Sequence, residues 1–393
     1  MYKSMNIMFL FYKPIIPNAG GVQRVTYALT KELQKRGHNV IFVSNTDKED
    51  IVNYDFVAPQ YHLELNERNE QDIENELKTL IRQNNITHVI CQTLDKAYLF
   101  KYIPSDVKKI AVCHVQPFSF MGISRKRIWN TNAQNFRQLL FKTASLISPG
   151  IHESFFYKFE KQALEDSNKY ADKICFISER FYPRIKKYLP DLPQEKFVAI
   201  NNPNTYDVSD IELPKDKENI ILWVGRVENA QKNAIDFIRM WQYLSPRAKG
   251  WRAIMVGDGN DLAYIKDYVM KNKIEHIEFT GRRSDIETFY RKAKYIAVTS
   301  YGESWGLVLT EAMSYGCVPV VYDTYETLHD IVDDKKNGYI IPNISYKSMA
   351  DCLYNCMQEE DEFNKLSIVA NNEAQKFSLG STVDKWENLL RSI

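Results

Sequence analysis

The chain has 393 residues, of which 44% are hydrophobic and 26% are charged. This length and composition exclude a disordered or fibrous protein and leave room for two globular domains of ordinary size. The formal net charge of +1 argues against a general nucleic-acid-binding protein, although Lys and Arg outnumber Asp and Glu about two to one between residues 96 and 203.

The cysteines and the apolar runs predict a cytoplasmic location. The six cysteines form no C-x-x-C pair, and several stand in strand-like apolar runs, as reduced core cysteines do. The apolar run at residues 6–11 is too short for a secretory signal, and no run approaches the roughly 18 residues that span a bilayer. We expect neither a metal site nor a cofactor.

The first half of the chain alternates between predicted strands and helices. An apolar run at 6–11 is followed by a glycine-containing turn and by Val22, Val25, Leu29 and Leu33 at helical spacing. Gly37 ends this helix, and another apolar run follows at 39–44. Further strands are predicted at residues 88–92, 109–115 and 173–178. Strand, helix and strand in this order indicate an α/β fold with a parallel sheet.

A second alternating series follows the polar stretch 201–219, which we interpret as the interdomain linker. Its strands are predicted at residues 219–225, 251–257, 277–281, 295–300 and 318–323. The prediction is therefore two consecutive parallel-sheet domains, residues 1–203 and 204–375. A final helix within 376–393 is expected to pack back on the first domain.

Paired glycines, Gly20 and Gly21, join the first predicted strand to the first predicted helix. Such a loop allows backbone N–H groups to approach an anion at a helix N-terminus. The alternative is a plain turn, since the loop lacks the G-x-G-x-x-G pattern of dinucleotide-binding proteins.

Two cations follow the first strand of the second series. Arg226 and Lys232 come directly after the run at 219–225, where open α/β sheets bind their ligands. An arginine and a lysine at a strand end suit a diphosphate, the arginine by a forked contact and the lysine as a point charge. Solvated surface charge is the alternative.

The segment ESWGLVLTE contains Glu303 and Glu311, with Gly306 between them. In a continuous helix the two acids would be roughly 12 Å apart, at about 1.5 Å of rise per residue, which is too far for a shared proton or metal. We predict Glu303 in the loop after a strand and Glu311 on the following helix, so that one ligand could contact both acids. Solvated glutamates are the alternative.

Two further features of the first half are candidates for function. His114 stands at the end of the predicted strand 109–115 and is either a ligand contact or a structural histidine. The segments GISRKRIW (122–129) and FYPRIKKYL (181–189) mix cations with aromatic residues. They suit either contact with anionic lipid headgroups or solvated helix faces.

Together these residues resemble the retaining GT-B glycosyltransferases of family 4, along nearly the whole chain. The resemblance is carried by GGVQRVTYALTKELQKRGHNV, AVCHVQP, ADKICFISE, WVGRVENAQKN, MVGDGNDLAYIK, FTGRRSDIETFYRKAKYIAVTSYGESWGLVLTEAMSYGCVPVV and NGYIIP. It implies two Rossmann-like domains that face a cleft, a nucleotide-sugar donor, and a sugar or lipid-linked acceptor. Peripheral contact with the inner face of the membrane would fit such an acceptor.

The resemblance also implies roles for individual residues. Glu303 would contact the donor sugar and Glu311 the nucleotide ribose, while Arg226 and Lys232 would neutralise the leaving diphosphate. The other implied contacts are backbone donors to the phosphates at Gly306, Leu307 and Val308, a flank for the base around Arg283, His114 near the sugar, and Gly20 and Gly21 over the phosphates. Fixed cations and N–H dipoles stabilise the charge that builds on the leaving group.

Two departures from the family pattern stand out. Arg226 and Lys232 are one residue further apart than in many members, and Glu326-Thr327 replaces a common Gly-Gly pair. The prediction is a retaining transferase that uses a nucleotide diphosphate sugar, most simply a UDP-sugar. Its alternatives are a GT-B epimerase or phosphorylase, and a nucleotide-sugar-binding protein without turnover.

Overall fold

The computed structural model describes residues 4–16, 20–44, 57–63, 70–119, 136–206, 213–214 and 216–393. These residues divide into two compact units. Unit 1 contains the described residues up to Thr205 together with Leu379–Ile393, and unit 2 those from Tyr206 to Ser378. The divisions fall two and three residues beyond the predicted boundaries of 203 and 375.

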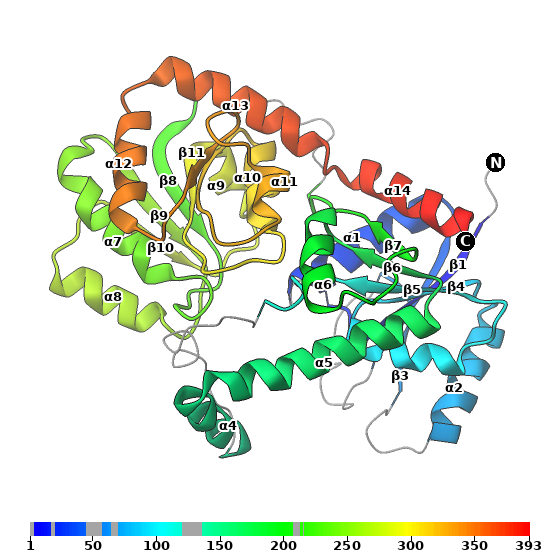
Figure 1. The fold of residues 1–393 in the computed structure, drawn as a ribbon. Coiled ribbons are helices and arrows are strands. Elements are labelled where there is room, and N and C mark those ends of the chain that lie inside the picture. The colour runs from blue at the N-terminus through cyan, green and yellow to red at the C-terminus, as the bar shows by residue number, and fades with distance from the viewer. Residues whose placement is uncertain are drawn as a thin grey trace. The chain divides into compact units, whose positions relative to one another are not determined.

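Unit 1 is built on a seven-stranded sheet in which every neighbouring pair of strands is parallel (Figure 1). The strand order is β3-β2-β1-β4-β5-β6-β7. The strands are β1 (Asn6–Phe11), β2 (Asn39–Ser44), β3 (Gln60–His62), β4 (His88–Cys91), β5 (Lys108–Cys113), β6 (Lys173–Phe176) and β7 (Phe197–Ala199). The central strands are almost wholly buried, as expected of a parallel sheet covered on both faces.

Helices cover both faces of this sheet. They are α1 (Gly21–Lys35), α2 (Glu70–Gln83), the 3₁₀ segment η2 (Leu94–Tyr102), α4 (Phe136–Ile147), α5 (Pro149–Tyr170), η3 (Glu179–Phe181), α6 (Tyr182–Tyr188) and α14 (Leu379–Ser392). Helix α1 ends at Lys35, and Gly37 two residues later has a left-handed backbone with a φ of 90°. The N–H of the next residue, His38, then bonds to the carbonyl of Leu33 at 3.0 Å and closes the last turn.

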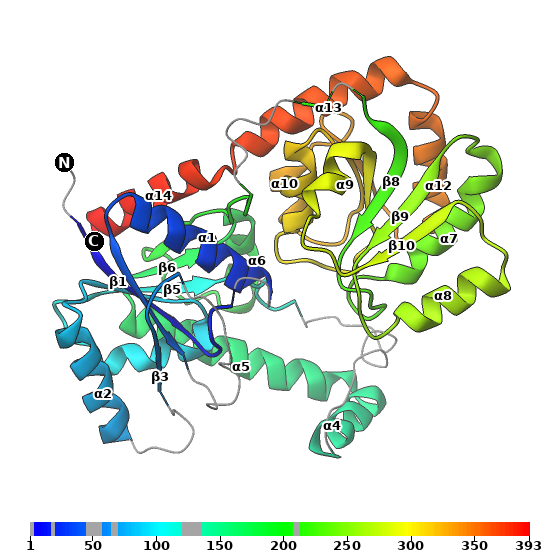
Figure 2. The same cartoon turned by 180° about the vertical axis from the view of Figure 1, so that it is seen from behind.

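Helix α14 follows all of unit 2 in the sequence but packs against α1 of unit 1, as Figures 1 and 2 show from opposite sides. Two side chains just after α1 hold it through Glu387: Arg36 at 2.8 Å and His38 at 2.7 Å. The side chain of His88 also bonds to the carbonyl of Leu390 at 2.9 Å. Contacts this far apart in sequence make α14 an integral part of unit 1.

Unit 2 is built on a six-stranded, fully parallel sheet with the order β10-β9-β8-β11-β12-β13. Its strands are β8 (Glu218–Val224), β9 (Arg252–Val256), β10 (Ile277–Gly281), β11 (Ala293–Val298), β12 (Val318–Tyr322) and β13 (Tyr339–Ile341). The predicted α/β fold with two parallel sheets is therefore confirmed. Three short strands, β3, β7 and β13, lie at sheet edges and were not predicted.

The helices of unit 2 lie on both faces of its sheet, with α7, α8 and α12 on one side and α9, α10 and α13 on the other (Figures 1 and 2). They are α7 (Ala234–Leu244), η4 (Ser245–Arg247), α8 (Leu262–Lys271), α9 (Glu287–Lys292), α10 (Leu307–Ser314), α11 (Leu328–Ile331), α12 (Tyr346–Cys356) and α13 (Glu360–Gln375). Among the described residues, no helix is long and apolar enough to cross a membrane.

The strand order of unit 2 reverses direction between β8 and β11. From β8 the chain moves to β9 and β10 on one side, and then returns to β11, β12 and β13 on the other. The loops that leave the carboxyl ends of β8 and β11 therefore diverge to opposite faces of the sheet and leave a crevice. These two loops contain Arg226, Lys232 and Glu303.

Candidate functional site

Lys232 and Glu303 come together at the reversal point of unit 2. Lys232 Nζ lies 2.6 Å from Glu303 Oε1, and the two side chains are 23% and 10% exposed. Ser300 Oγ donates a second hydrogen bond to the same carboxylate oxygen at 2.7 Å. The pair is partly withdrawn from water at the carboxyl ends of two central strands, so solvent screens it less than it screens a fully exposed surface pair.

Thr299 fixes the two loops against each other. Its hydroxyl donates to the carbonyls of Lys232 and Asn233, at 3.1 Å each. The indole N–H of Trp223 in turn donates to that hydroxyl at 3.1 Å. These hydrogen bonds fix the backbone of Lys232 and therefore the direction in which its side chain leaves the loop.

Arg226 is placed differently from Lys232. Its side chain is 63% exposed and pairs with Glu228 two residues later, at 2.9 Å. The loop around it is braced by Asn229, whose N–H bonds to Asp261 at 2.6 Å and whose side-chain oxygen accepts from the N–H of Ile235 at 2.9 Å. The extra residue between Arg226 and Lys232 is thus accommodated by an ordered loop that caps α7.

The backbones of neighbouring loops pack closely beneath this site. A Cβ at Gly257 would lie 1.8 Å from the carbonyl oxygen of Gly225, and a Cβ at Gly259 would lie 2.4 Å from that of Val227. Any larger residue would push the β8 loop away from the β9 loop. The segment MVGDGNDLAYIK carried part of the family resemblance, but this packing role of its glycines was not predicted.

Gly306 begins helix α10 in a left-handed conformation, with φ 89° and ψ 55°. The first amides of the helix, at Leu307 and Val308, have no intrahelical acceptor and carry the positive end of the helix dipole. Both residues are partly exposed. The first of these backbone donors, at Leu307, stands two residues beyond Trp305 and four beyond Glu303. The contact of these amides with phosphates, which the resemblance implied, stays a prediction.

The loop after β12 supports the Glu303 loop through residues that sequence reasoning missed. Thr324 donates to the carbonyl of Ser300 and Thr327 to that of Ser304, each at 2.8 Å. Between them Tyr325 is only 4% exposed and its hydroxyl lies against Gly306. The Glu326-Thr327 pair therefore does not behave as a flexible glycine loop, because Thr327 ties it to the neighbouring loop.

Glu311 is completely buried, and its Oε2 accepts a hydrogen bond from Tyr290 at 3.1 Å. It lies on α10, as predicted, and Glu303 lies in the preceding loop. The two acids are therefore on different elements, but the structure leaves Glu311 covered where its predicted contact with a ribose would need it open. That contact stays a prediction.

Arg283 follows β10 and is engaged by its own loop. Its guanidinium makes a forked pair with Asp285, with both contacts at 2.8 Å, and its side chain is 45% exposed. The guanidinium also lies 5.8 Å from the ring centre of Phe289. The structure does not bring Arg283 into contact with Lys232 or Glu303, and its expected place beside the base stays a prediction.

The remaining predicted residues, His114, Gly20 and Gly21, belong to unit 1. Burial lowers the pKa of His114 to about 4, although interaction of the protonated ring with the side chain of Asn202 opposes this, so the ring is neutral at pH 7. Its Nε2 lies 2.5 Å from the side-chain oxygen of Gln92 and donates to it. His114 follows β5 and Gln92 follows β4, at the carboxyl ends of adjacent strands.

The two glycines stand at the start of α1. Gly20 is the N-cap with an extended backbone (φ 172°) that any residue can adopt, and among the described residues a Cβ there would meet Gln23 Oε1, at 3.5 Å. Neither conformation nor space requires a glycine at position 20 in this structure. The approach of a ligand to the bare backbone at this loop stays a prediction.

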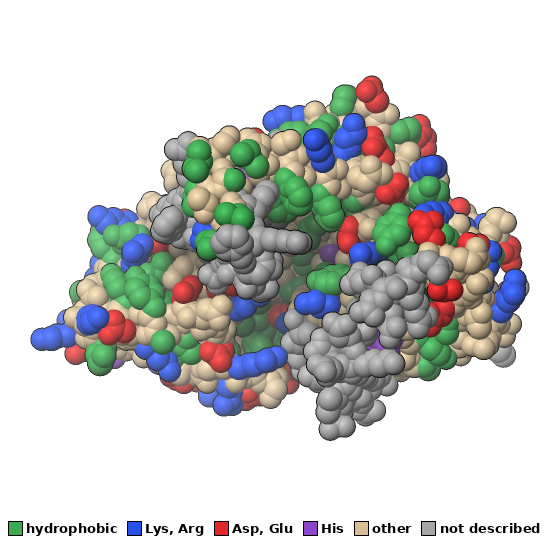
Figure 3. Space-filling view, turned by 90° about the horizontal axis from the view of Figure 1, so that it is seen from below, with side chains coloured by type: hydrophobic (Ala, Val, Ile, Leu, Met, Phe, Trp, Pro, Cys, Tyr) green, Lys and Arg blue, Asp and Glu red, His purple; other side chains and the backbone are tan. Residues whose placement is uncertain are grey.

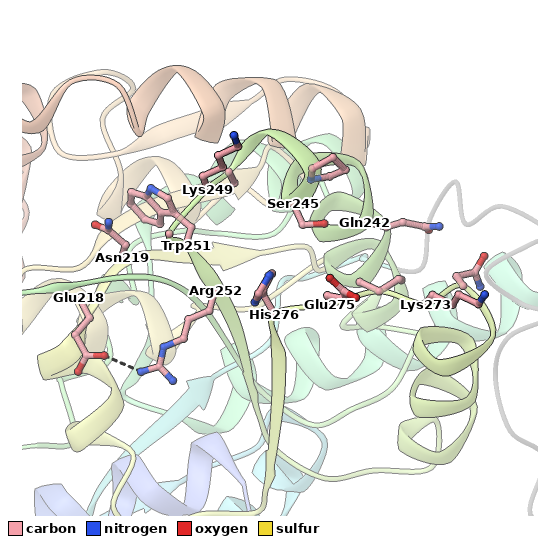
Figure 4. A pocket seen from close by; sticks show the side chains of 15 residues that line it. Glu218, Asn219, Gln242, Ser245, Lys249, Trp251, Arg252, Lys273, Glu275 and His276 are labelled. Atoms are coloured by element: carbon pink, nitrogen blue, oxygen red, sulfur yellow. Dashed lines mark hydrogen bonds and ion pairs between the residues drawn. The ribbon is translucent and has the colours of Figure 1, made fainter.

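Unit 2 also has a cavity of about 860 Å³ that lies away from this site. It is lined by the amino ends of β8 and β9 and by the residues before β10 (Figure 4). Glu218 and Arg252 pair within it at 2.7 Å. The hollow therefore opens at the edge of the sheet opposite Glu303, where open α/β sheets do not usually bind their ligands.

Only one of the two basic aromatic segments falls among the described residues. The basic segment 122–129 lies outside them, whereas 181–189 contributes η3 and α6, on which Lys186 and Lys187 are exposed. Among the described residues, no group of three His, Cys, Asp or Glu side chains is arranged to hold a metal ion.

Comparison with known proteins accounts for both units. Residues 207–375 match the model of the glycosyl transferases group 1, and residues 19–203 match that of glycosyltransferase family 4. Among solved structures, the Anabaena protein HepE in complex with UDP is similar over 99% of this chain and all of its own, with a TM-score of 0.75 and 16% identity. That likeness establishes the shared fold.

Curated relatives are similar over part of their length. A poly(ribitol-phosphate) alpha-N-acetylglucosaminyltransferase of Staphylococcus aureus is 26% identical over 314 residues, 75% of this chain and 58% of its own. A poly(glycerol-phosphate) alpha-glucosyltransferase of Bacillus subtilis is 24% identical over 216 residues, 55% of this chain and 32% of its own. The chain thus spans about a third to three-fifths of the length of these relatives. With both halves matched by consecutive family models and two parallel-sheet units in that order, the chain belongs to the GT-B glycosyltransferases of family 4.

Proposed function

We propose that the chain transfers a sugar, with retention of anomeric configuration, from a nucleotide diphosphate donor to an acceptor hydroxyl. The observation that carries the proposal is the pair of Lys232 and Glu303 at the reversal point of unit 2, beside the open N-terminus of α10. The cation and the helix amides suit a diphosphate, and Glu303 suits the sugar attached to it.

The same geometry explains how the site would act on the donor. Cleavage of a sugar from a diphosphate builds negative charge on the leaving group, which the ammonium of Lys232 and the amides of Leu307 and Val308 would stabilise. Arg226 is exposed enough to swing from Glu228 to the same diphosphate. In a retaining reaction of this kind the leaving phosphate takes the acceptor's proton, and Glu303 positions the sugar.

A UDP-sugar is the first donor to test. Support comes from HepE, whose structure was solved with UDP, and from the named relatives, which transfer glucose or N-acetylglucosamine. The acceptors in those names are polymeric alditol phosphates. We therefore propose a polysaccharide or glycolipid precursor with a free hydroxyl as the acceptor.

The test is UDP release from UDP-glucose and UDP-N-acetylglucosamine, with and without a poly(glycerol-phosphate) or poly(ribitol-phosphate) acceptor. Release that depends on the acceptor supports transfer, and NMR of the product's anomeric signal tests retention. Sugar phosphate formed only when phosphate is added would identify a phosphorylase, and an altered sugar on the nucleotide an epimerase. Binding without any turnover would leave a nucleotide-sugar-binding protein.

Variants test the assignment of the site. Arg226→Ala and Glu303→Ala should each lower turnover, whereas Arg252→Ala is a matched control. Arg252 is a partly exposed arginine of the same unit that pairs with Glu218 at the opposite edge of the sheet. Full activity in both Arg226→Ala and Glu303→Ala would contradict the assignment.

We further propose that the enzyme works in the cytoplasm and touches the inner face of the membrane. Support comes from an exposed apolar row on α5, formed by Ile151, Phe155 and Phe159 at four-residue spacing, and from Leu140 and Ile147 on α4, all 47–75% exposed. Figure 3 views the side on which these two helices lie and shows hydrophobic side chains gathered there. Co-sedimentation with phosphatidylglycerol vesicles, lost in Phe155→Ser/Phe159→Ser, would test this contact.

A further inference from the structure

A buried hydroxyl stands next to the candidate site without a hydrogen-bond partner among the described residues. Tyr325 is only 4% exposed, and its Oη makes no hydrogen bond with any of them. The hydroxyl lies against Gly306, where the position of a Cβ would be 2.9 Å from the oxygen. Tyr325 therefore reaches the turn that connects Glu303 to α10.

An unmade hydrogen bond of this kind destabilises the fold, because the hydroxyl loses water and gains nothing in return. A phenylalanine would fill the same space without that loss. The neighbouring Thr324 and Thr327 make different use of their hydroxyls, since both donate to carbonyls of the Glu303 loop. The presence of a hydroxyl at position 325 therefore needs an explanation other than the stability of the fold.

Glu303 supplies that explanation. Lys232 and Ser300 both bind its Oε1. Burial raises the pKa of the Tyr325 phenol well above its usual value, and the nearby negative charge of Glu303 raises it further. The phenol therefore stays protonated at any physiological pH and is available only as a donor toward a carboxylate.

Donor binding changes the partners of Glu303. In the structure Lys232 pairs with that carboxylate, yet the proposed function requires the same ammonium at the diphosphate. When the phosphates of the donor bind Lys232, the Glu303 carboxylate loses its cationic partner, although it must then hold the sugar of the same donor. A second donor close to it would then keep it in place.

We infer that Tyr325 is a positioning residue, whose hydroxyl donates to Glu303 when the donor's diphosphate draws Lys232 away. The inference rests on the proposed function, since it assumes that a nucleotide diphosphate binds at Lys232. It adds a residue of the β12 loop to the site and gives the buried hydroxyl a partner in the liganded state.

The test compares Tyr325→Phe with Tyr295→Phe, a matched control in the same unit. Tyr295 is also buried, but its hydroxyl already donates to the carbonyl of Cys356 at 3.1 Å. Tyr295→Phe should lower the urea midpoint of the ligand-free protein and leave UDP binding unchanged. Tyr325→Phe should leave the midpoint unchanged or raise it, while UDP binds roughly 10-fold more weakly and kcat falls by a similar factor.

A second background separates positioning from packing. In Glu303→Gln the side chain carries no charge that needs a partner, so adding Tyr325→Phe should change the Kd of UDP less than twofold. A loss that persists in that background, an unchanged Kd in Tyr325→Phe, or a midpoint as low as that of Tyr295→Phe would each overturn the inference. Wild-type protein that binds no nucleotide diphosphate would overturn the proposed function with it, whereas UDP binding without sugar transfer would refute only the proposed function.

Discussion

Gly306→Ala tests how tightly the candidate site is packed, through stability alone. The backbone at this position has a φ of 89°, which costs an alanine about 1–2 kcal/mol. The new Cβ would also lie 2.9 Å from Tyr325 Oη and 3.4 Å from a methyl carbon of Leu309, so the buried tyrosine must move by a few tenths of an ångström. Overpacking of this kind adds about 1 kcal/mol, for a total of about 2–3 kcal/mol.

The assay is urea unfolding of three single variants and one double variant, analysed from the midpoint and slope. Gly250→Ala is the control, because Gly250 lies in the same unit with a φ of 79° and nothing within 4 Å of the new Cβ. It should show the backbone cost alone. Tyr325→Phe removes the oxygen that the new Cβ meets, so Gly306→Ala should cost about 1 kcal/mol less in that background.

The reasoning is refuted if Gly306→Ala costs no more than Gly250→Ala, since the contact with Tyr325 would then be absent. It is also refuted if the double variant shows no coupling. Either result would place the tyrosine hydroxyl away from the turn and would remove the geometric basis of its proposed action on Glu303.

Three further predictions concern charged groups. Lys232→Met should remove the cationic partner of Glu303, lowering stability by about 1–3 kcal/mol and reducing UDP affinity, which calorimetry can measure; unchanged UDP binding would contradict the assigned role. Burial raises the pKa of Glu160 to about 7, although the N–H of Phe118 and the charge of Arg184 oppose this shift. The folded state therefore favours the protonated carboxyl, and the stability that this group adds to the fold is lost as the pH rises from about 4.5 to 7. Glu160→Gln should therefore gain stability over the wild type by about 1–3 kcal/mol at pH 8 and nothing at pH 4, in urea titrations at both pH values. Glu387→Ala removes the partner of His38 and should weaken the packing of α14 on unit 1, so a protease should cut faster within residues 379–393. Asp384→Ala is the control, because the carboxylate of Asp384 is far more exposed and its loss should have a smaller effect.

The strands of both sheets were predictable because parallel strands buried on two faces read as unbroken apolar runs, as at 6–11 and 219–225. The edge strands β3, β7 and β13 have only three residues each and are partly exposed, so no such run marks them. Their pairing depends on neighbouring strands that are distant in sequence, and a local pattern does not carry that information.

The candidate site was predictable where position after a strand determines it. Lys232 and Glu303 each follow a central strand, and the reversal of strand order brings them together. The role of Tyr325 was not predictable, because it depends on the β12 loop packing under the β11 loop. The burial of Glu311 against Tyr290 likewise arises from the contact of α10 with the segment after β10, which spacing along the chain does not reveal.

The division of the chain has a consequence for synthesis. Unit 2 is inserted into unit 1, because α14 completes unit 1 only after all of unit 2 has been made. Until then His38, Arg36 and the backbone-bonded His88 lack their partners on α14. On the ribosome the first unit to emerge is therefore the last to be finished, and unit 2 can fold while α1 and β4 still expose the surface that α14 will cover. Emergence of residues 379–393, rather than emergence of the N-terminal half, would be the event that commits unit 1 to its native state.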